Sequence, residues 1–249
     1  MQDLVLREDR DGCATLILNR PDKLNALTVA LFAELEAHVA AIERDTERVG
    51  LVVVRGAGKC FSAGNDLADI AAGHKPPRPN FQSQIVERLA DLPQPVIAAV
   101  HGHCYTGGLE LALAGDLIVA AQSAKFADTH GKWGLTPVWG MSQRLPRRVG
   151  AAKAKEMMFT CRTYSGEEAL AMGLATACVP DARFDEAVAA LAAEILGNSW
   201  HSHRANKALL RDTDGMPLSG GLAHETFRSA GVAPDARDRL AAFAGKKGS

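Results

Sequence analysis

The chain has 249 residues, enough to bury the core of one large domain. Its net charge of −1 offers no general attraction to nucleic acid or to an anionic membrane, so we expect neither partner. No window contains the roughly 18 apolar residues that a membrane helix needs. The five cysteines lack Cys-x-x-Cys spacing and the N-terminus resembles no signal or transit peptide, which predicts a cytoplasmic protein with reduced thiols.

The first half of the chain is predicted to alternate strands with helices. Apolar, β-branched runs indicate strands, and an apolar stripe that begins after Thr28 indicates a helix capped by that residue. Because helix follows strand repeatedly, we expect an α/β fold of parallel β–α units. The expected strands are 14–18, 51–55, 96–100 and 117–121, the expected helices are 28–43 and 81–90, and 68–80 is expected to be a loop or a frayed helix.

From residue 142 onward the pattern is almost wholly helical, with one strand-like break at 175–179. A shift in composition near Pro180 divides the chain into a core of residues 1–180 and a helical region of residues 181–249. These late helices have little sheet to cover, so we expect them to pack on another subunit. The helices expected there are 184–196, 200–211, 218–229 and 235–243.

Two glycine-rich segments, 60–67 and 101–110, each follow an apolar strand and precede a predicted helix. A strand that turns into a helix through glycine leaves free N–H groups at the N-terminus of the helix. Two such turns side by side would aim the N–H groups of Asn65 and Gly107 at one oxygen, as an oxyanion hole does. The glycines that would let a carbonyl group approach closely are Gly64, Gly107 and Gly108.

Glu110 lies about one turn into the second of these helices, within an otherwise apolar stretch. A carboxylate there is costly unless it is used or paired, and burial would raise its pKa toward a useful range. We therefore predict that Glu110 transfers protons. The alternative is that it pairs with a structural arginine or lysine. Asp116 is expected to have a structural role at the start of the next strand.

Four segments in the right order resemble the crotonase superfamily, the enoyl-CoA hydratase/isomerase family, over almost the whole chain. They are residues 19–27, 61–67, 101–116 and 137–145, and the chain from Phe184 onward resembles the helical C-terminal region of the family. The resemblance implies a crotonase-type ββα superhelix with a C-terminal oligomerisation region that forms homotrimers, often paired into hexamers. Thr106 departs from the family pattern, which usually has Gly or Ala there.

The resemblance implies an enzyme whose substrate is an acyl-CoA thioester, with coenzyme A as part of that substrate and with no other cofactor and no metal. The leading reaction is hydration of a trans-2-enoyl-CoA, a lyase reaction of fatty acid metabolism. The first alternative is Δ3-Δ2 enoyl-CoA isomerisation or another crotonase-type reaction that needs one acid/base, and C–C hydrolysis or decarboxylation comes after it. A non-catalytic CoA- or RNA-binding member is a fourth reading, favoured only by the basic residues within 144–155.

The residues that would contact the substrate or its CoA also follow from the resemblance. Trp133 and Trp139 would flank the acyl group, although one of them is expected to serve core packing instead. The cations that would reach the CoA phosphates are Lys23, Arg20, Lys246 and Lys247. The complete expected contact set is Lys23, Ala26, Ala63, Gly64, Asp66, Leu67, Gly108, Trp133 and Trp139.

His130 occupies the place where hydratases of this family carry a second glutamate, counted back from residues 143–145 without a gap. A neutral imidazole accepts or donates a proton near pH 7, so His130 is a second catalytic candidate that would assist Glu110. The alternatives are a pocket wall or a structural residue. Asp128 would share a face with His130 in extended backbone and would either orient its ring or be the acid itself. If His130 acts as a base, hydration should decline on the acid side.

Overall fold

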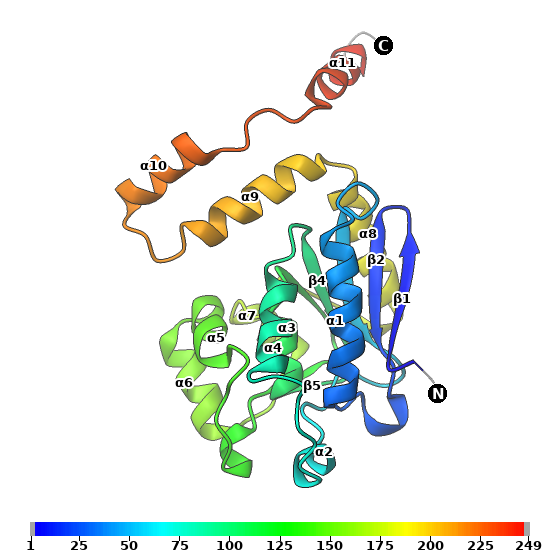
Figure 1. Ribbon diagram of the computed structural model, residues 1–249, viewed down its shortest axis with the longest axis vertical. Helices are drawn as coiled ribbons and strands as arrows, with labels where there is room; N and C mark the ends of the chain where they lie inside the picture. Colours follow the sequence, from blue (N-terminus) through cyan, green and yellow to red (C-terminus); the bar gives the residue numbers. More distant parts are fainter. Residues whose placement is uncertain (1–2, 247–249) are drawn as a thin grey trace.

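The computed structural model describes residues 3–246, with side chains up to residue 244. Its main sheet has the strand order β1-β2-β3-β4-β6-β9 (Figure 1). β1 pairs antiparallel with β2, and each later pair of neighbours is parallel, which confirms the expected β–α units. The strands are β1 (Val5–Arg10), β2 (Cys13–Leu18), β3 (Leu51–Gly56), β4 (Val96–Val100), β6 (Leu117–Ala121) and β9 (Ala177–Val179).

Helices cover both faces of this sheet. α1 (Val29–Glu43) and α3 (Phe81–Ala90) pack on one face, where they share a core cluster with Val52 and Val54 of β3. The Thr28 side chain accepts a hydrogen bond from the N–H of Leu31, so it caps α1 as predicted. These apolar contacts fix the strand ends from which the loops of the site emerge.

The second face is covered by α8 (Phe184–Leu196). Its buried side chains Phe184, Val188 and Ala192 contact the alternate residues of β3, β4 and β6. The expectation that the helices from 184 onward pack on another subunit is therefore wrong for α8. The physical reason is that the central strands are apolar on both faces, which leaves a second surface to cover. The division of the chain at residue 180 stays a prediction.

A second, smaller sheet has the order β5-β7-β8. It brings the segment that carries Gly107 and Glu110 beside the segment that carries His130. β5 and β7 are parallel, so their ends at Tyr105 and Ala127 lie side by side, and Thr106 N donates to Ala127 O at 2.8 Å. β5 leads directly into α4, and β7 leads into residues 128–130. The elements are β5 (His103–Tyr105), β7 (Lys125–Ala127), β8 (Tyr164–Ser165) and α4 (Gly107–Leu113).

Short helices fill the region between these elements and the end of the sheet. The segment expected to be a loop or a frayed helix contains α2, which spans five residues. The bounds are η1 (Pro21–Lys23), α2 (Leu67–Ala71), the 3-10 helix η2 (His130–Trp133), α5 (Met141–Val149), α6 (Ala151–Thr160), α7 (Gly166–Ala171) and η3 (Asp181–Arg183). Within residues 3–246, no helix combines the length and the apolar character needed to cross a membrane.

The last helices, α9 (Trp200–Asp212), α10 (Leu218–Arg228) and α11 (Ala236–Lys246), lie at one end of the molecule, and α10 and α11 extend away from the sheet (Figure 1). α9 is anchored on the core through Lys207, whose Nζ lies 2.7 Å from Asp116 Oδ2. This ion pair confirms a structural role for Asp116, which also accepts a hydrogen bond from Val96 N.

Candidate active site

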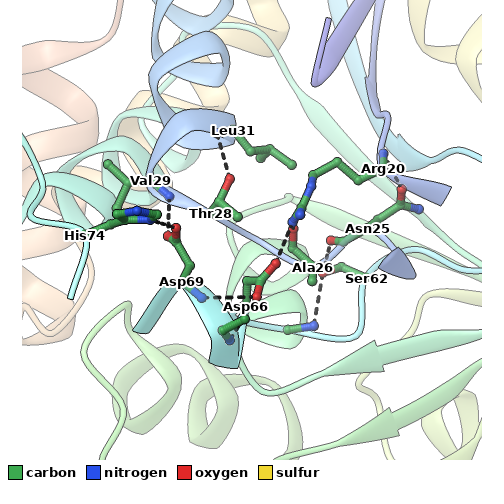
Figure 2. A network of polar contacts seen from close by, with 12 residues as sticks. Arg20, Asn25, Ala26, Thr28, Val29, Leu31, Ser62, Asp66, Asp69 and His74 are labelled. Atoms are coloured by element: carbon green, nitrogen blue, oxygen red, sulfur yellow. Dashed lines mark hydrogen bonds and ion pairs between the residues drawn. The ribbon is translucent and has the colours of Figure 1, made fainter. Parts of the chain in front are cut away.

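The segment that carries Asn65 is held by a buried polar network from the 19–27 turn. The Asn25 amide donates to Ala57 O at 2.8 Å and to Cys60 O at 2.7 Å. Ser62 Oγ donates to Asn25 O at 2.8 Å and accepts from Gly64 N at 3.1 Å (Figure 2). Because buried polar groups are stable only when they are paired, this network fixes the backbone that leads to Asn65.

An ion pair secures the other end of this segment. Arg20 Nη1 lies 2.9 Å from Asp66 Oδ2 and also donates to Ala26 O (Figure 2). Asp66 caps α2 through hydrogen bonds from the N–H groups of Ala68 and Asp69. Burial raises the pKa of Asp66, but the hydrogen bonds from Arg20 and from these N–H groups lower it by more. The pKa of Asp66 therefore lies below the ordinary value. Arg20, expected at the CoA phosphates, is thus engaged inside the protein.

The two predicted oxyanion N–H groups lie in the same place. A Cβ added to Gly107 would lie 3.4 Å from Asn65 N, and one added to Gly64 would lie 3.5 Å from Gly107 N. Gly64 has a φ of +101°, and its added Cβ would also lie 2.7 Å from Tyr105 O, so only glycine fits there. Among the described residues, neither N–H donates to another backbone group. Both are therefore available to an oxygen at the N-terminus of α4.

Thr106 precedes α4 with a φ of +50°, which is uncommon for a β-branched residue. Its Oγ1 lies 2.5 Å from Thr129 Oγ1 and accepts a hydrogen bond from Thr129 N at 3.1 Å. These two bonds join the start of α4 to the segment that carries His130. The departure from the usual Gly or Ala thus provides a hydroxyl that neither of those residues has.

Glu110 is 1% exposed, and its carboxylate is fixed by backbone donors. Its Oε1 accepts hydrogen bonds from Trp139 N at 2.8 Å and from Met141 N at 3.1 Å. Burial raises the pKa of Glu110 above the ordinary value, although these two N–H groups and the charge of His130 oppose the shift. Among the described residues, its ion pair is with His130 and not with an arginine or lysine. The alternative that Glu110 pairs with a structural cation of that kind therefore has no support.

His130 lies beside Glu110, as the count along the sequence predicted. Its Nε2 is 3.8 Å from Glu110 Oε2, and its Nδ1 is 2.6 Å from Asp128 Oδ1. Burial lowers the pKa of His130, but the Asp128 hydrogen bond and the charges of Asp128 and Glu110 outweigh it, so its pKa is raised. Of the two roles considered for Asp128, the geometry matches the one that orients the ring.

A cavity of about 480 Å³ is lined by Asn65 and by Thr129, which precedes His130 in the chain; Glu110, Gly107 and His130 are not among its lining residues. Trp133 lines it and is 58% exposed, whereas Trp139 is 6% exposed and packs edge-on against Phe32 with the ring centroids 5.0 Å apart. Trp139 therefore has the expected packing role, beneath Gly107. Gly108 packs against Ser62 and does not belong to the lining. The lining residues predicted from the sequence are Lys23, Ala26, Ala63, Asn65, Asp66, Leu67 and Trp133.

Five lining residues were missed: Tyr105, Thr106, Thr129, Lys132 and Leu135. The signal that could have found them is proximity in sequence, because they flank Gly107 and His130. Of the two tail lysines expected at CoA, Lys246 ends α11 without a described side chain, and Lys247 lies outside the described residues.

The comparisons with known proteins agree with this geometry. The family model for enoyl-CoA hydratase/isomerase matches residues 8–246. The chain belongs to the enoyl-CoA hydratase/isomerase family. The family implies an acyl-CoA substrate and an enzyme of the hydratase/isomerase type.

The relatives of this family member include proteins named as a hydratase and as an isomerase. One is a probable peroxisomal enoyl-CoA hydratase of Arabidopsis thaliana, 31% identical over 90% of this chain and 84% of that protein. Another is the 1,2-epoxyphenylacetyl-CoA isomerase of Escherichia coli K12, 32% identical over 99% of this chain and 97% of that protein. An enoyl-CoA hydratase structure from Bacillus anthracis superposes with a TM-score of 0.90 at 32% identity, covering 98% and 97% of the two chains. The crotonase-type fold is thereby confirmed.

The basic stretch that favoured an RNA-binding member is engaged within this family member. Arg144 pairs with Glu87, and Arg147 pairs with Asp214. Arg148 donates to the carbonyl oxygens of Gly115 and Asp116, and Lys153 pairs with Glu156. These four side chains are engaged by the fold, whereas Lys155 of the same stretch is exposed. Within the described part of the chain, no three His, Cys, Asp or Glu side chains are arranged to hold a metal ion.

Proposed function

We propose that this family member adds water to a trans-2-enoyl-CoA thioester. The observation that supports it most directly is the 3.8 Å separation between Glu110 Oε2 and His130 Nε2. Because this is less than twice the length of a hydrogen bond, one water molecule can contact both atoms. Hydration needs one group that takes a proton from water and another that supplies a proton to the α-carbon. Glu110 and His130 are suited to divide that work.

The paired N–H groups of Asn65 and Gly107 would receive the thioester oxygen. A proton leaves the water as its oxygen bonds to the β-carbon, and the π electrons of the double bond move onto the thioester oxygen as an enolate. The enolate then takes a proton at the α-carbon, and the carbonyl forms again. The N–H groups stabilise the step in which negative charge develops on that oxygen.

The cavity beside these groups is the proposed place of the acyl group and of the adjoining part of CoA. Lys23 lines it and is exposed, so it remains the proposed contact for a CoA phosphate. Trp133 and Leu135 would contact the acyl group, since both line the cavity and present apolar surface to solvent. Filling the cavity would remove that surface from water.

Isomerisation of a Δ3-enoyl-CoA to the Δ2 form is the second candidate function. The observation that favours it is the imidazole at residue 130, which leaves Glu110 as the one carboxylate of the Glu110–His130 pair. Moving a proton between two carbons of one substrate needs a single base. C–C hydrolysis and decarboxylation have no comparable observation in their favour.

The deciding experiment is turnover by the full chain on a panel of trans-2- and Δ3-enoyl-CoA thioesters of increasing length. A gain of one water in product mass is the expected result, and Glu110→Gln supplies the matched control. A product of unchanged mass with a shifted double bond would favour the isomerase. Failure to turn over any acyl-CoA, with RNA binding at physiological salt, would favour the non-catalytic class.

We also propose that the protein assembles as a homo-oligomer, a trimer or a hexamer, through its last helices. A groove of about 480 Å³ lies between α9 and α10, and Leu210, Leu218 and Leu222 line it. These side chains are 76%, 80% and 56% exposed in the single chain. The occupant that fits an apolar surface of this kind is a second copy of the chain. The cytoplasmic location stays a prediction.

A further inference from the structure

We propose that Asp128 is a positioning residue that holds His130 as an imidazolium, so that His130 is the proton donor and Glu110 the base. The division of roles rests on the proposed hydration. The link between Asp128 and His130 stands on geometry that is independent of it. Hydratases that carry a second glutamate at this place would share the work between two carboxyl groups. Here an imidazolium and a carboxylate would share it instead.

The hydrogen bonds of Asp128 define the state of the ring. Asp128 Oδ1 accepts from both the backbone N–H and Nδ1 of His130, at 3.1 and 2.6 Å. An ionised carboxylate only accepts hydrogen bonds, so Nδ1 carries a proton. Against an ionised Glu110, Nε2 presents either a lone pair, which the carboxylate repels, or a second proton, which it attracts.

The balance of buried charge also favours the second proton. Asp128 and Glu110 are each 1% exposed, and among the described residues the ion pair of each is with His130. With Glu110 ionised as the proposed base, a neutral ring would leave two buried carboxylates without a counter-charge, which is strongly unfavourable. The other titratable groups near the ring are Lys132, exposed on η2, and Cys161, whose Sγ packs beside Gly131. Neither forms an ion pair with these carboxylates.

The segment around Asp128 is fixed relative to the oxyanion groups. Thr129 bonds through its hydroxyl and its N–H to Thr106, directly before Gly107. His130 therefore has a defined position relative to both Glu110 and the N-terminus of α4. The raised pKa of His130 has the sign that this arrangement requires.

The proposed roles balance over one turnover. Glu110 takes a proton from water, and His130 gives its Nε2 proton to the α-carbon of the enolate. After the product leaves, the proton on Glu110 Oε2 returns to His130 Nε2 across the 3.8 Å that separates them. The active form thus holds one proton on the pair. Activity should decline at low pH as Glu110 is protonated, and also at high pH as His130 loses its proton.

This second decline distinguishes the inference from the simpler expectation that His130 is a neutral base. A base of that kind loses activity only as it is protonated on the acid side. A donor with a raised pKa keeps its activity until the pH rises through that value. The basic limb of the rate profile is therefore the kinetic readout, and the titration of the His130 ring is the direct one.

The first experiment measures the titration of His130 in the intact protein by NMR of labelled histidine. The His130 signal is assigned by its loss in His130→Gln, since the chain has eight histidines. At pH 6.5, where an ordinary imidazole is half charged, we expect the His130 ring to be more than half charged. A ring that is mostly neutral at that pH would overturn the inference without any variant of Asp128.

The second experiment compares Asp128→Asn with the parent. The amide oxygen can still accept a hydrogen bond but carries no charge, so His130 should titrate at lower pH. The basic limb of the rate profile should move the same way by about one pH unit or more. Asp69→Asn is the matched control, because Asp69 binds the ring of another histidine, His74, at the edge of the site (Figure 2). It should leave the His130 titration unchanged.

The outcomes separate this inference from the proposed function. If Asp128→Asn lowers turnover equally at every pH and leaves the His130 titration in place, Asp128 is merely structural and the inference fails. If the parent turns over no acyl-CoA while His130 still titrates as expected, the proposed function fails and the Asp128–His130 link survives. In the His130→Gln background, Asp128→Asn should add little further loss, because its effect passes through the ring.

Discussion

The helix that carries Glu110 and the helices at the end of the chain bury their side chains in opposite ways. Every residue of α4 is buried, from Gly107 to Leu113. α9 and α10 contain no buried residue, although Leu218 and Phe227 are large and apolar. The proposed catalytic groups are therefore buried within one chain, whereas the apolar side chains of α10 are not covered by any other part of that chain among the described residues.

This difference teaches that the site and the assembly surface are separable. The site depends on contacts within residues 20–141, and the apolar surface lies on α9 and α10, at the other end of the sheet from α2 (Figure 1). Mutations at Glu110 and His130 should thus alter the chemistry without changing assembly. Mutations on α10 should do the reverse. Four expectations test this contrast, in order of decreasing effect.

The largest effect is expected from Glu110→Gln. The amide oxygen can still accept the hydrogen bonds from Trp139 and Met141, so the fold should survive while proton transfer is lost. We expect turnover to drop by roughly 10²–10⁴-fold, with the sedimentation coefficient unchanged. Glu194→Gln, an exposed substitution on α8, is the control. Near-parental turnover by Glu110→Gln on every substrate would show that Glu110 is not the acid or base.

A smaller effect is expected at residue 130. His130→Gln should cost about 10–100-fold, since a second general acid or base contributes at the lower end of the usual range. His130→Glu introduces a third buried carboxylate beside Asp128 and Glu110, so its turnover should be no higher than that of His130→Gln. Combined with Asp128→Asn, it should recover part of the hydration rate.

Rates on the enoyl-CoA panel would check this expectation. If hydration is unchanged in His130→Gln while Glu110→Gln is inactive, Glu110 works alone and the isomerase becomes the better proposal. If His130→Glu is fully active without the second substitution, Asp128 carries no charge that matters to residue 130.

Much of the fold could be predicted from the sequence because its signals are local. Apolar runs marked the central strands, and the Thr28 cap marked the start of α1. β1 was missed because its outer half is the charged run Glu8 to Arg10, which pairs only with β2. β5, β7 and β8 have two or three residues each, too few to show a period of two. The place of α8 could have been inferred from Leu51 to Val54, where four consecutive buried residues indicate two covered faces.

The site shows the same boundary between local and distant information. The two glycine-rich segments predicted where the N–H groups of Asn65 and Gly107 lie, and a count along the chain placed His130. The donors to Glu110 Oε1 lie 29 and 31 residues later in the sequence, at Trp139 and Met141. The engagement of Arg20 by Asp66 likewise spans 46 residues. No local pattern reports such pairs, because tertiary packing creates them.

The third expectation concerns assembly alone. Replacing Leu222 and Phe227 by serine removes apolar surface from α10, where the two side chains are 56% and 83% exposed. We expect a smaller sedimentation coefficient at micromolar concentration and an unchanged kcat. A truncation after Thr213 would remove α10 and α11 and leave α8 on the sheet, so it should weaken assembly without exposing the core. A full-length protein that sediments as a monomer would contradict the proposed oligomer.

The smallest effect is expected at Glu156, which links α6 to β8 on the side of the core that supports η2. Its carboxylate binds Lys153, Tyr164 and Arg162, and the hydrogen bonds from Lys153 and Tyr164 lower its pKa from 4.5 to about 2. A carboxyl group whose pKa is lower in the folded state stabilises the fold above its unfolded pKa. It loses that contribution as the pH falls through the folded value.

Glu156→Gln should therefore lower the thermal midpoint slightly at pH 7, and the gap from the parent should close between about pH 4.5 and pH 2. Glu194→Gln, on an exposed helix face, should show no such pH-dependent gap. The kcat at pH 7 should remain parental, because Glu156 touches neither Glu110 nor His130 in any described contact. A gap that persists unchanged at pH 2 would mean that packing, not the charge of Glu156, holds α6 to β8. The core and the exposed helices α9 and α10 would then differ only in how much apolar surface they bury.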